Sequence, residues 1–299
     1  MRPRVCVFPS AADLEAAVEL GGGTVSGAGT ADALVLVEGN RNVDVPLHDG
    51  VRWVQSSSAG NENLIRAGLL DGKRVWTSAA GVYARPIAEH ALGLLLAAAR
   101  NLHAYARVQS WQRLDARMLG ESTVGVVGAG GIGSAVIAHL DDLGARTIAI
   151  TRSGHGVARA SDFGGPELLP RLLAISDFVV LGAPLTRETR RLIDEHALEQ
   201  MQPHAWVVNV ARGELVDTEA LVAALRAGRI GGAALDAVDP EPLPDGHPLW
   251  GLPNAIVTPH TAATLREWRP LFADRVAENV GRFARGEPLL GTIDPELGY

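Results

Sequence analysis

The sequence of 299 residues has little cysteine and no long apolar run. Cys6 is the only cysteine, so an intramolecular disulfide and a cysteine-rich metal site are both excluded, and we expect no metal. Cys6 lies in the alternating stretch RVCVF, which predicts a small core residue on a strand. The longest apolar run, 92–99, falls far short of the roughly 20 residues that span a bilayer, so we expect no membrane association.

Positive charge is not in excess either. The formal net charge is −7 at pH 7, and acidic and basic residues are mixed along the chain. Without a basic stripe to neutralise phosphates, nucleic acid is not expected as a partner. The apolar run near the N-terminus is only four residues long, so we expect no signal peptide and a cytoplasmic location.

What the sequence does contain is an alternation of short apolar runs with longer helical segments. Four runs in the first part predict strands, at 4–8, 33–37, 51–55 and 74–78. A long helical segment, 85–108, follows and has Pro86 near its first turn. Because this segment is apolar over most of its circumference, we predict that it is buried, within the chain or against another subunit.

A second alternating series fills most of the remaining chain. Helical patterns at 131–142 and 217–227 separate some of its strands, and a final helix is expected at 265–285. Apolar strands that alternate with helices indicate a parallel sheet covered on both faces. Two such series predict two domains, and the final helix can return to the first of them. The predicted strands of the second series are 123–127, 147–151, 178–183, 206–211, 233–238 and 255–259.

The segment 122–135, STVGVVGAGGIGSA, carries the pattern G-x-G-x-x-G between a predicted strand and a predicted helix. Gly128 permits a tight turn, Gly130 lets a pyrophosphate approach the backbone, and Gly133 allows close packing of helix on strand. The N–H groups at the helix N-terminus can then bind the phosphates. The alternative is an ordinary strand–helix turn, but the strand–helix units that follow favour dinucleotide binding.

The end of the next predicted strand bears on the choice of dinucleotide. An acidic residue at this place binds the ribose 2′-hydroxyl of NAD. This chain has Thr151, Arg152 and Ser153 there instead. A carboxylate would repel a 2′-phosphate whereas an arginine pairs with it, so we predict a preference for NADP(H) over NAD(H). The alternative is that Arg152 is simply a solvated loop cation.

Three polar residues follow three successive strands of the second series: Arg212, Glu241 and His260. Ligands of open α/β sheets bind outside the carboxyl ends of the strands, so the three side chains can converge. A protonated His260 can donate to the oxygen of a ketone that receives a hydride, and Glu241 would favour the imidazolium. Arg212 can hold a neighbouring carboxylate. Taken singly, each residue has an ordinary structural alternative as a turn cap, a surface acid or a loop histidine.

These motifs resemble those of the D-isomer-specific 2-hydroxyacid dehydrogenase family, and the resemblance covers nearly the whole chain. The spacing also fits, since Glu241 lies 29 positions after Arg212 and His260 lies 19 positions after Glu241. The segments that carry the resemblance are VGVVGAGGIG, NVARGELVD, AALDAVDPEPLP, IVTPHTA, APLTRETRRLID and PIAEHALGLLLAAAR.

The resemblance implies a fold and an assembly. The fold class is α/β, with a Rossmann-type NAD(P)-binding domain, 93–266, inserted in a flavodoxin-like substrate domain that combines 1–92 with 267–299. The long helix around 86–108 is similar to the family's dimerisation element, which implies a homodimer.

The resemblance also implies contacts with the ligands. Asp236 would contact the nicotinamide carboxamide, and the backbone N–H groups of Ala59 and Gly60 would hold the substrate carboxylate together with Arg212. Many members have arginine or lysine where this chain has Gly131, so one phosphate contact is missing or supplied elsewhere. The expected cofactor contacts are Gly128, Gly130, Gly131, Ile132, Gly133, Thr151, Arg152, Ser153, Ala183, Pro184, Ala211 and Asp236.

The activity that the resemblance implies is reduction of a small 2-oxo acid. The sequence Thr-Arg-Ser at 151–153 is similar to that of the NADP-using glyoxylate/hydroxypyruvate reductases, so glyoxylate or hydroxypyruvate is the expected substrate. A non-catalytic dinucleotide sensor like the C-terminal-binding-protein corepressors, which keep the same three residues, stays open as an alternative. A phosphite dehydrogenase of the same family is another. Formate dehydrogenase is disfavoured because that branch has glutamine in place of Glu241.

Overall fold

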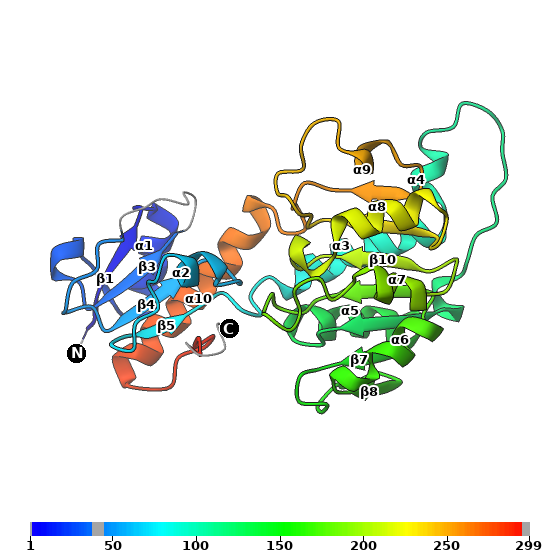
Figure 1. Ribbon diagram of the computed structural model, residues 1–299. Coiled ribbons are helices and arrows are strands. Elements are labelled where there is room, and N and C mark those ends of the chain that lie inside the picture. The colour runs from blue at the N-terminus through cyan, green and yellow to red at the C-terminus, as the bar shows by residue number, and fades with distance from the viewer. Residues whose placement is uncertain (1, 38–44, 295–299) are drawn as a thin grey trace. The chain divides into compact units, whose positions relative to one another are not determined.

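The computed structural model describes residues 2–37 and 45–294 and divides the chain into two compact units. Unit 1 combines Met1–Tyr83 with Thr264–Tyr299, and unit 2 is Ala84–Ala263. The chain thus leaves unit 1 once, forms unit 2 and returns. Figure 1 shows that each unit is a parallel sheet flanked by helices.

Unit 1 contains a five-stranded parallel sheet of order β2-β1-β3-β4-β5. This order is that of flavodoxin-like folds, as predicted. The strands are β1 (Arg4–Phe8), β2 (Thr24–Val25), β3 (Ala33–Leu36), β4 (Trp53–Ser56) and β5 (Val75–Thr77). The helices are α1 (Ala12–Leu20), α2 (Glu62–Arg66) and α10 (Leu265–Arg285).

Helix α10, from the end of the chain, packs beside α1 on one face of this sheet. Its buried residues Phe272, Val276 and Val280 join Val5 and Trp53 in one apolar cluster. Helix α2 and the segment after α10 contribute to a second cluster on the other face. Because α10 supplies part of the core, unit 1 is built from both ends of the sequence.

Unit 2 contains a seven-stranded parallel sheet of order β12-β11-β10-β9-β6-β7-β8. The order reverses direction at β6, as in Rossmann-type folds. The strands are β6 (Thr123–Val127), β7 (Arg146–Ile150), β8 (Asp162–Gly164), β9 (Phe178–Leu181), β10 (Trp206–Asn209), β11 (Gly232–Leu235) and β12 (Ala255–Val257). The helices are α3 (Ala84–Ala99), α4 (Leu102–Tyr105), α5 (Gly131–Asp142), α6 (Leu169–Ile175), α7 (Glu195–Gln200), α8 (Thr218–Arg226) and α9 (Pro248–Gly251).

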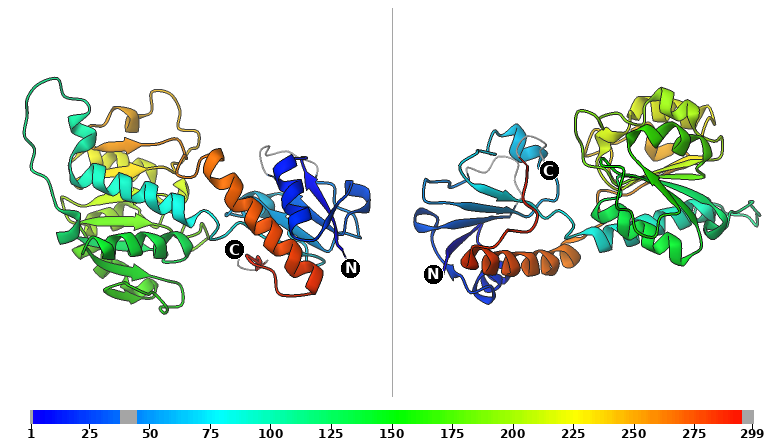
Figure 2. Two further views of the ribbon diagram at one scale, coloured as in Figure 1. Left: turned by 180° about the vertical axis from the view of Figure 1, so that it is seen from behind. Right: turned by 90° about the horizontal axis from the view of Figure 1, so that it is seen from below.

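Helices cover both faces of the unit 2 sheet, as Figure 2 shows. One apolar cluster joins the sheet to α3 and α5, and another joins it to α6, α7 and α8. Burial on both faces explains why the central strands read as continuous apolar runs. Within the described part of the chain, no helix has the length and apolar character that crossing a membrane requires.

The units divide at 83/84 and 263/264, earlier than the predicted 92/93 and 266/267, and helix α3 explains the first of these differences. All of α3 belongs to unit 2, where it packs on α5, β10 and β11. Its buried residues share the apolar cluster of α5. The sequence could not place this boundary, because an apolar helix face does not identify the surface that it covers.

The helical segment predicted over 85–108 is confirmed for 85–99 and 102–105, but it is not one continuous helix. Helix α3 ends at Ala99, and Asn101 adopts a left-handed backbone with φ 54° before the short α4. Asparagine tolerates this conformation better than most residues, and an α-helix cannot continue through it. Residues 106–118 then form an exposed segment without helix or strand, the long loop that leaves α4 in Figure 1.

Candidate active site

The glycine pattern lies between β6 and α5, as predicted, and each of its glycines has a different environment. Gly128 has φ 92°, and a Cβ there would overlap the backbone of Ala183. A Cβ at Gly133 would overlap the carbonyl oxygen of Gly128. Gly130 has a φ of −76°, and a Cβ there would meet open space. Two of the glycines are therefore needed for packing, whereas the packing does not require Gly130.

The open space at Gly130 fits the dinucleotide that the pattern predicts. Helix α5 begins at Gly131, and the N–H groups of a helix's first turn have no acceptor within the helix. They can bind an anion with the help of the helix dipole. The loop also lies where the strand order reverses, between β6 and β9, the usual place for a dinucleotide. The residues present thus fit a bound pyrophosphate.

The turn after β7 has the position that contacts the adenosine ribose in such folds. The Thr151 hydroxyl donates to the carbonyl of His155 at 3.3 Å, and Arg152 and Ser153 are exposed. Residues 151–156 contain no carboxylate. The local charge of this turn is therefore positive.

The other predicted cofactor contacts lie at the ends of neighbouring strands. Ala183 follows β9, is buried and lies against Gly128. The Pro184 carbonyl accepts a hydrogen bond from the Thr189 hydroxyl at 2.7 Å. Ala211 follows β10 and is also buried. All of these residues lie at the carboxyl-terminal side of the sheet, the side of the glycine loop.

The structure brings Glu241 and His260 together. Nδ1 of His260 lies 3.0 Å and 3.1 Å from the two carboxylate oxygens of Glu241. An ionised carboxylate only accepts hydrogen bonds, so Nδ1 carries the hydrogen. Nε2 is then the ring nitrogen that can exchange a proton with a ligand. The His260 side chain is 46% exposed, which leaves it accessible.

The backbone that carries His260 is strained and is held by Asp236. His260 has φ 50°, a left-handed conformation that costs about 1–3 kcal/mol outside glycine. Asp236 is buried, and its carboxylate accepts hydrogen bonds from the Thr258 hydroxyl (2.6 Å), the Thr261 N–H (2.8 Å) and the Ala262 N–H (3.0 Å). These bonds offset the strain, so Asp236 has a role in the turn that the sequence did not reveal.

Arg212 follows β10, the strand next to β11. Its guanidinium donates to the carbonyl of Ala211 at 2.8 Å. The buried Asn209 donates to the carbonyls of Arg212 (2.8 Å) and Ala237 (3.2 Å), and so joins the loops after β10 and β11. A Cβ at Gly213 would overlap the Val238 carbonyl, so the two loops pack backbone to backbone.

Asn209 and Gly213 hold the backbone around Arg212, and the sequence did not reveal them. A signal for Asn209 was available, because an amide inside the apolar run WVVNVA must find partners when the strand is buried. For Gly213 the signal was weaker, since many glycines in loops meet only open space. What both residues share is that they fix Arg212 against the loop that leads to Glu241.

Ala59 and Gly60 lie in unit 1, in the loop between β4 and α2. The Tyr83 hydroxyl donates to the Ser57 carbonyl at 2.6 Å, and the N–H of Ala79 donates to the Ser58 carbonyl at 2.8 Å. The carbonyls just before Ala59 are therefore held by the segment after β5. This loop lies at the carboxyl end of β4, and hydrogen bonds fix its backbone, as a loop that binds a carboxylate requires.

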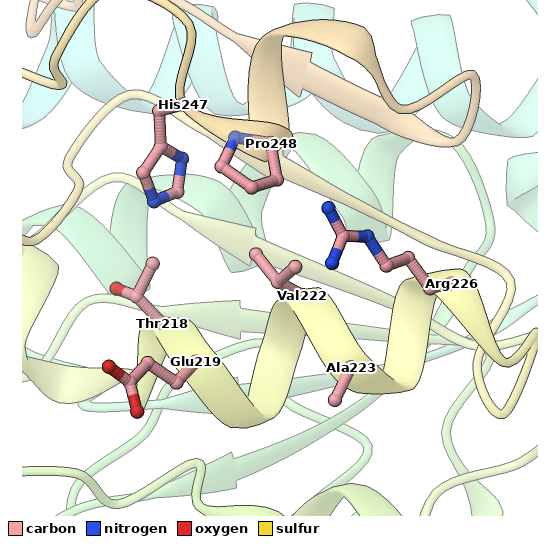
Figure 3. Close-up of a pocket in the computed structure, with 7 residues that line it drawn as sticks. All are labelled: Thr218, Glu219, Val222, Ala223, Arg226, His247 and Pro248. Atoms are coloured by element: carbon pink, nitrogen blue, oxygen red, sulfur yellow. The ribbon is translucent and has the colours of Figure 1, made fainter.

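A hollow lies on unit 2 beside the chain that leads to Glu241. The Thr218 hydroxyl donates to the Asp239 carbonyl at 2.6 Å and so fixes that chain against α8. The hollow lies beside this chain, and none of the predicted site residues lines it. Figure 3 shows its lining, which is Thr218, Glu219, Val222, Ala223, Arg226, His247 and Pro248.

The chain is similar to known proteins over most of its length. The family described as D-isomer specific 2-hydroxyacid dehydrogenase, NAD binding domain, matches residues 92–262. A protein of Corynebacterium melassecola described as uncharacterized is 38% identical over 260 residues, 85% of each chain. A glyoxylate reductase of Korarchaeum cryptofilum is 39% identical over 235 residues, 74% of this chain and 69% of that protein.

A solved structure is similar over the full length. It is a D-isomer specific 2-hydroxyacid dehydrogenase from Xanthobacter autotrophicus Py2 in complex with NADPH and MES, with a TM-score of 0.88, 30% identity and 100% of both chains covered. The chain described here belongs to the D-isomer specific 2-hydroxyacid dehydrogenase family. It is therefore an NAD(P)-dependent oxidoreductase that acts on CH–OH donors, with a Rossmann-type cofactor domain.

The two glycines Gly130 and Gly133 should respond differently to alanine. Gly130→Ala is expected to cost less than about 1 kcal/mol of folding stability, because its Cβ meets open space, but to weaken NADPH binding about tenfold or more. Gly133→Ala, in the first turn of α5, is the matched control. It should lower stability by about 1–3 kcal/mol through overlap with Gly128.

Thermal unfolding and a titration of NADPH fluorescence measure the two effects. An unchanged NADPH affinity in Gly130→Ala would show that the pyrophosphate does not approach this residue.

Proposed function

We propose that this enzyme is an NADPH-dependent reductase of a small 2-oxo acid, with glyoxylate or hydroxypyruvate as the favoured substrate. The observation that carries the proposal is the hydrogen-bonded pair of Glu241 and His260 at the carboxyl ends of neighbouring strands. The glyoxylate reductase among the relatives supports the choice of substrate. In this proposal unit 2 binds the cofactor and carries Arg212, Glu241 and His260.

The proposed mechanism assigns one role to each polar residue. When bound, NADPH would supply the hydride that the carbonyl carbon receives. Protonated His260 gives its Nε2 proton to the oxygen that becomes negative, while Glu241 keeps the hydrogen on Nδ1 and stabilises the imidazolium. Arg212 holds the carboxylate beside the carbonyl. In the reverse direction neutral His260 accepts the hydroxyl proton.

The preference for NADP(H) is proposed on the turn after β7. Arg152 is exposed there, Thr151 and Ser153 offer hydroxyl groups, and the sequence has no acid to repel a 2′-phosphate. A guanidinium is the side chain best suited to bind a phosphate with two parallel hydrogen bonds. The NADPH bound to the similar Xanthobacter structure supports this choice.

We further propose a homodimer whose contact lies somewhat later in the chain than the sequence indicated. The buried apolar residues of α3 pack inside unit 2, whereas the segment 102–118 exposes a series of apolar side chains. Trp111 is 93% exposed. A concentration of exposed apolar side chains marks an interaction surface, and a second copy of this chain is the proposed occupant. The exposed apolar residues are Leu102, Tyr105, Val108, Trp111, Leu114 and Met118.

His260 carries the most direct test of the reaction. His260→Ala should lower kcat with NADPH and glyoxylate by about 10²–10⁴, the usual contribution of a general acid. Glu241→Gln should give a smaller loss, because the ring stays oriented but the imidazolium loses its counter-charge. The control is His196→Ala on the exposed surface of α7.

Initial rates with a panel of 2-oxo acids measure this prediction. A wild-type protein that oxidises NADPH with none of them would refute the reductase, and turnover of phosphite alone would indicate the alternative substrate.

Arg152 tests the cofactor preference. The wild type should have a higher kcat/KM with NADPH than with NADH. Arg152→Ala should raise the KM for NADPH about tenfold and change the KM for NADH little, because one charge-assisted hydrogen bond contributes about 1.5–3 kcal/mol. The matched control is Arg159→Ala, an exposed arginine of the same connection that pairs with Asp141. Equal or better use of NADH by the wild type would contradict the proposal.

Trp111 tests the assembly. Light scattering should give the mass of two 31.4 kDa chains for the wild type and of one chain for Trp111→Glu with Leu114→Glu. Leu143→Glu, at another exposed apolar residue of unit 2, should stay dimeric. A monomeric wild type at micromolar concentration would overturn the proposed homodimer.

A further inference from the structure

The turn that carries His260, residues 258–262, makes a hydrogen bond with a side chain of helix α3. Nε2 of His90 lies 3.1 Å from the Thr258 hydroxyl, and that hydroxyl lies 2.6 Å from Oδ1 of Asp236. Nε2 of His90 is also 3.5 Å from the same Asp236 oxygen. His90 lies on α3, Thr258 directly follows β12 and Asp236 directly follows β11. Neither His90 nor Thr258 has a part in the mechanism proposed above.

The directions of these hydrogen bonds follow from the chemistry of the groups. The Asp236 carboxylate accepts and cannot donate when it is ionised. The single hydroxyl proton of Thr258 therefore points to Asp236, at the short distance that an O–H···O⁻ bond favours. The oxygen of Thr258 is then free to accept, and Nε2 of His90 must be the donor. The tautomer of His90 is thereby determined.

The backbone of this turn, together with Glu241, decides where the His260 ring lies. The His260 side chain is about half exposed, so the hydrogen bond to Glu241 and the backbone position hold the ring rather than packing. Its backbone N–H donates to the carbonyls of Asp236 (2.9 Å) and Thr258 (3.0 Å), and its φ of 50° is sustained only by the surrounding bonds. A loss of order at Thr258 would therefore move the ring even though no atom that touches a ligand has changed.

We propose that His90 and Thr258 are positioning residues that hold the His260 turn in the geometry needed for proton transfer. They act through Asp236, whose carboxylate also receives the N–H groups of Thr261 and Ala262. The chain of bonds anchors the turn to α3, a helix buried against α5 and the sheet. The inference rests on the proposed role of His260 as the general acid.

Four variants test the two residues in matched pairs. Thr258→Val removes the hydroxyl and keeps the shape, and Thr258→Ser restores the hydroxyl. His90→Phe removes the donor and keeps a flat ring, and His90→Gln restores an N–H at a similar distance from the backbone. Thr258→Val and His90→Phe should lower kcat about 10–100-fold, the effect of a small displacement of a catalytic group. Thr258→Ser and His90→Gln should recover most of this loss.

The division between kcat and KM distinguishes positioning from binding. The loss should fall on kcat, with the KM for NADPH and for glyoxylate changed less than about threefold. A loss that appears mainly in the KM for NADPH would overturn the proposal, because the network would then serve cofactor binding through Asp236. A serine variant as slow as the valine variant would overturn it as well.

Amide hydrogen exchange of the ligand-free protein supplies a readout that needs no activity. The N–H groups of Thr261 and Ala262 donate to Asp236, so they should exchange faster in Thr258→Val and His90→Phe than in the wild type. Unchanged exchange at both amides would refute the inference. A wild type that reduces no 2-oxo acid would refute the proposed function instead, and the exchange experiment would still decide whether His90 and Thr258 hold the turn.

Discussion

The candidate site depends on the hydrogen bonds that the buried carboxylate of Asp236 accepts. It gathers a hydroxyl and two backbone N–H groups from the turn after β12, while its own backbone carbonyl accepts the N–H of His260. A buried carboxylate is costly unless it is well hydrogen-bonded, and here the donors that satisfy it are those of the turn itself. The hydrogen bonds that satisfy this carboxylate therefore also hold the backbone of His260 in its left-handed conformation.

Close packing of backbone at the strand ends is the second constraint. Gly128, Gly133 and Gly213 each lie where a Cβ would overlap a neighbouring backbone. The loops after β6, β9, β10 and β11 thus approach one another more closely than side chains would permit. Asn209 then joins two of these loops with hydrogen bonds. Side chains on such loops are held by rigid elements, which is what positioning for catalysis requires.

Most of the architecture could be predicted because its signals are local. The bounds of α5 and α10 agree with the predicted 131–142 and 265–285. For α10 the reason is clear, since Thr264 and Glu267 form a capping box and Gly286 ends the helix with φ 70°. The predicted strands ran two or three residues too long at several carboxyl ends, because apolar residues continue into the buried loops. The edge strand β8 is short and poorly buried, so it had no apolar signal.

The sequence by itself determined the two parallel sheets and the glycine loop, and it indicated Arg212, Glu241 and His260 as candidate site residues, because periodicity and motif spacing can be followed along the chain. Only the tertiary structure decided what surrounds them. His90 and Thr258 lie 168 positions apart, and their contact depends on how α3 packs and on which strands are neighbours. Hydrogen bonds between distant segments leave no periodic trace in a sequence, and for this reason the network behind His260 became apparent only in three dimensions.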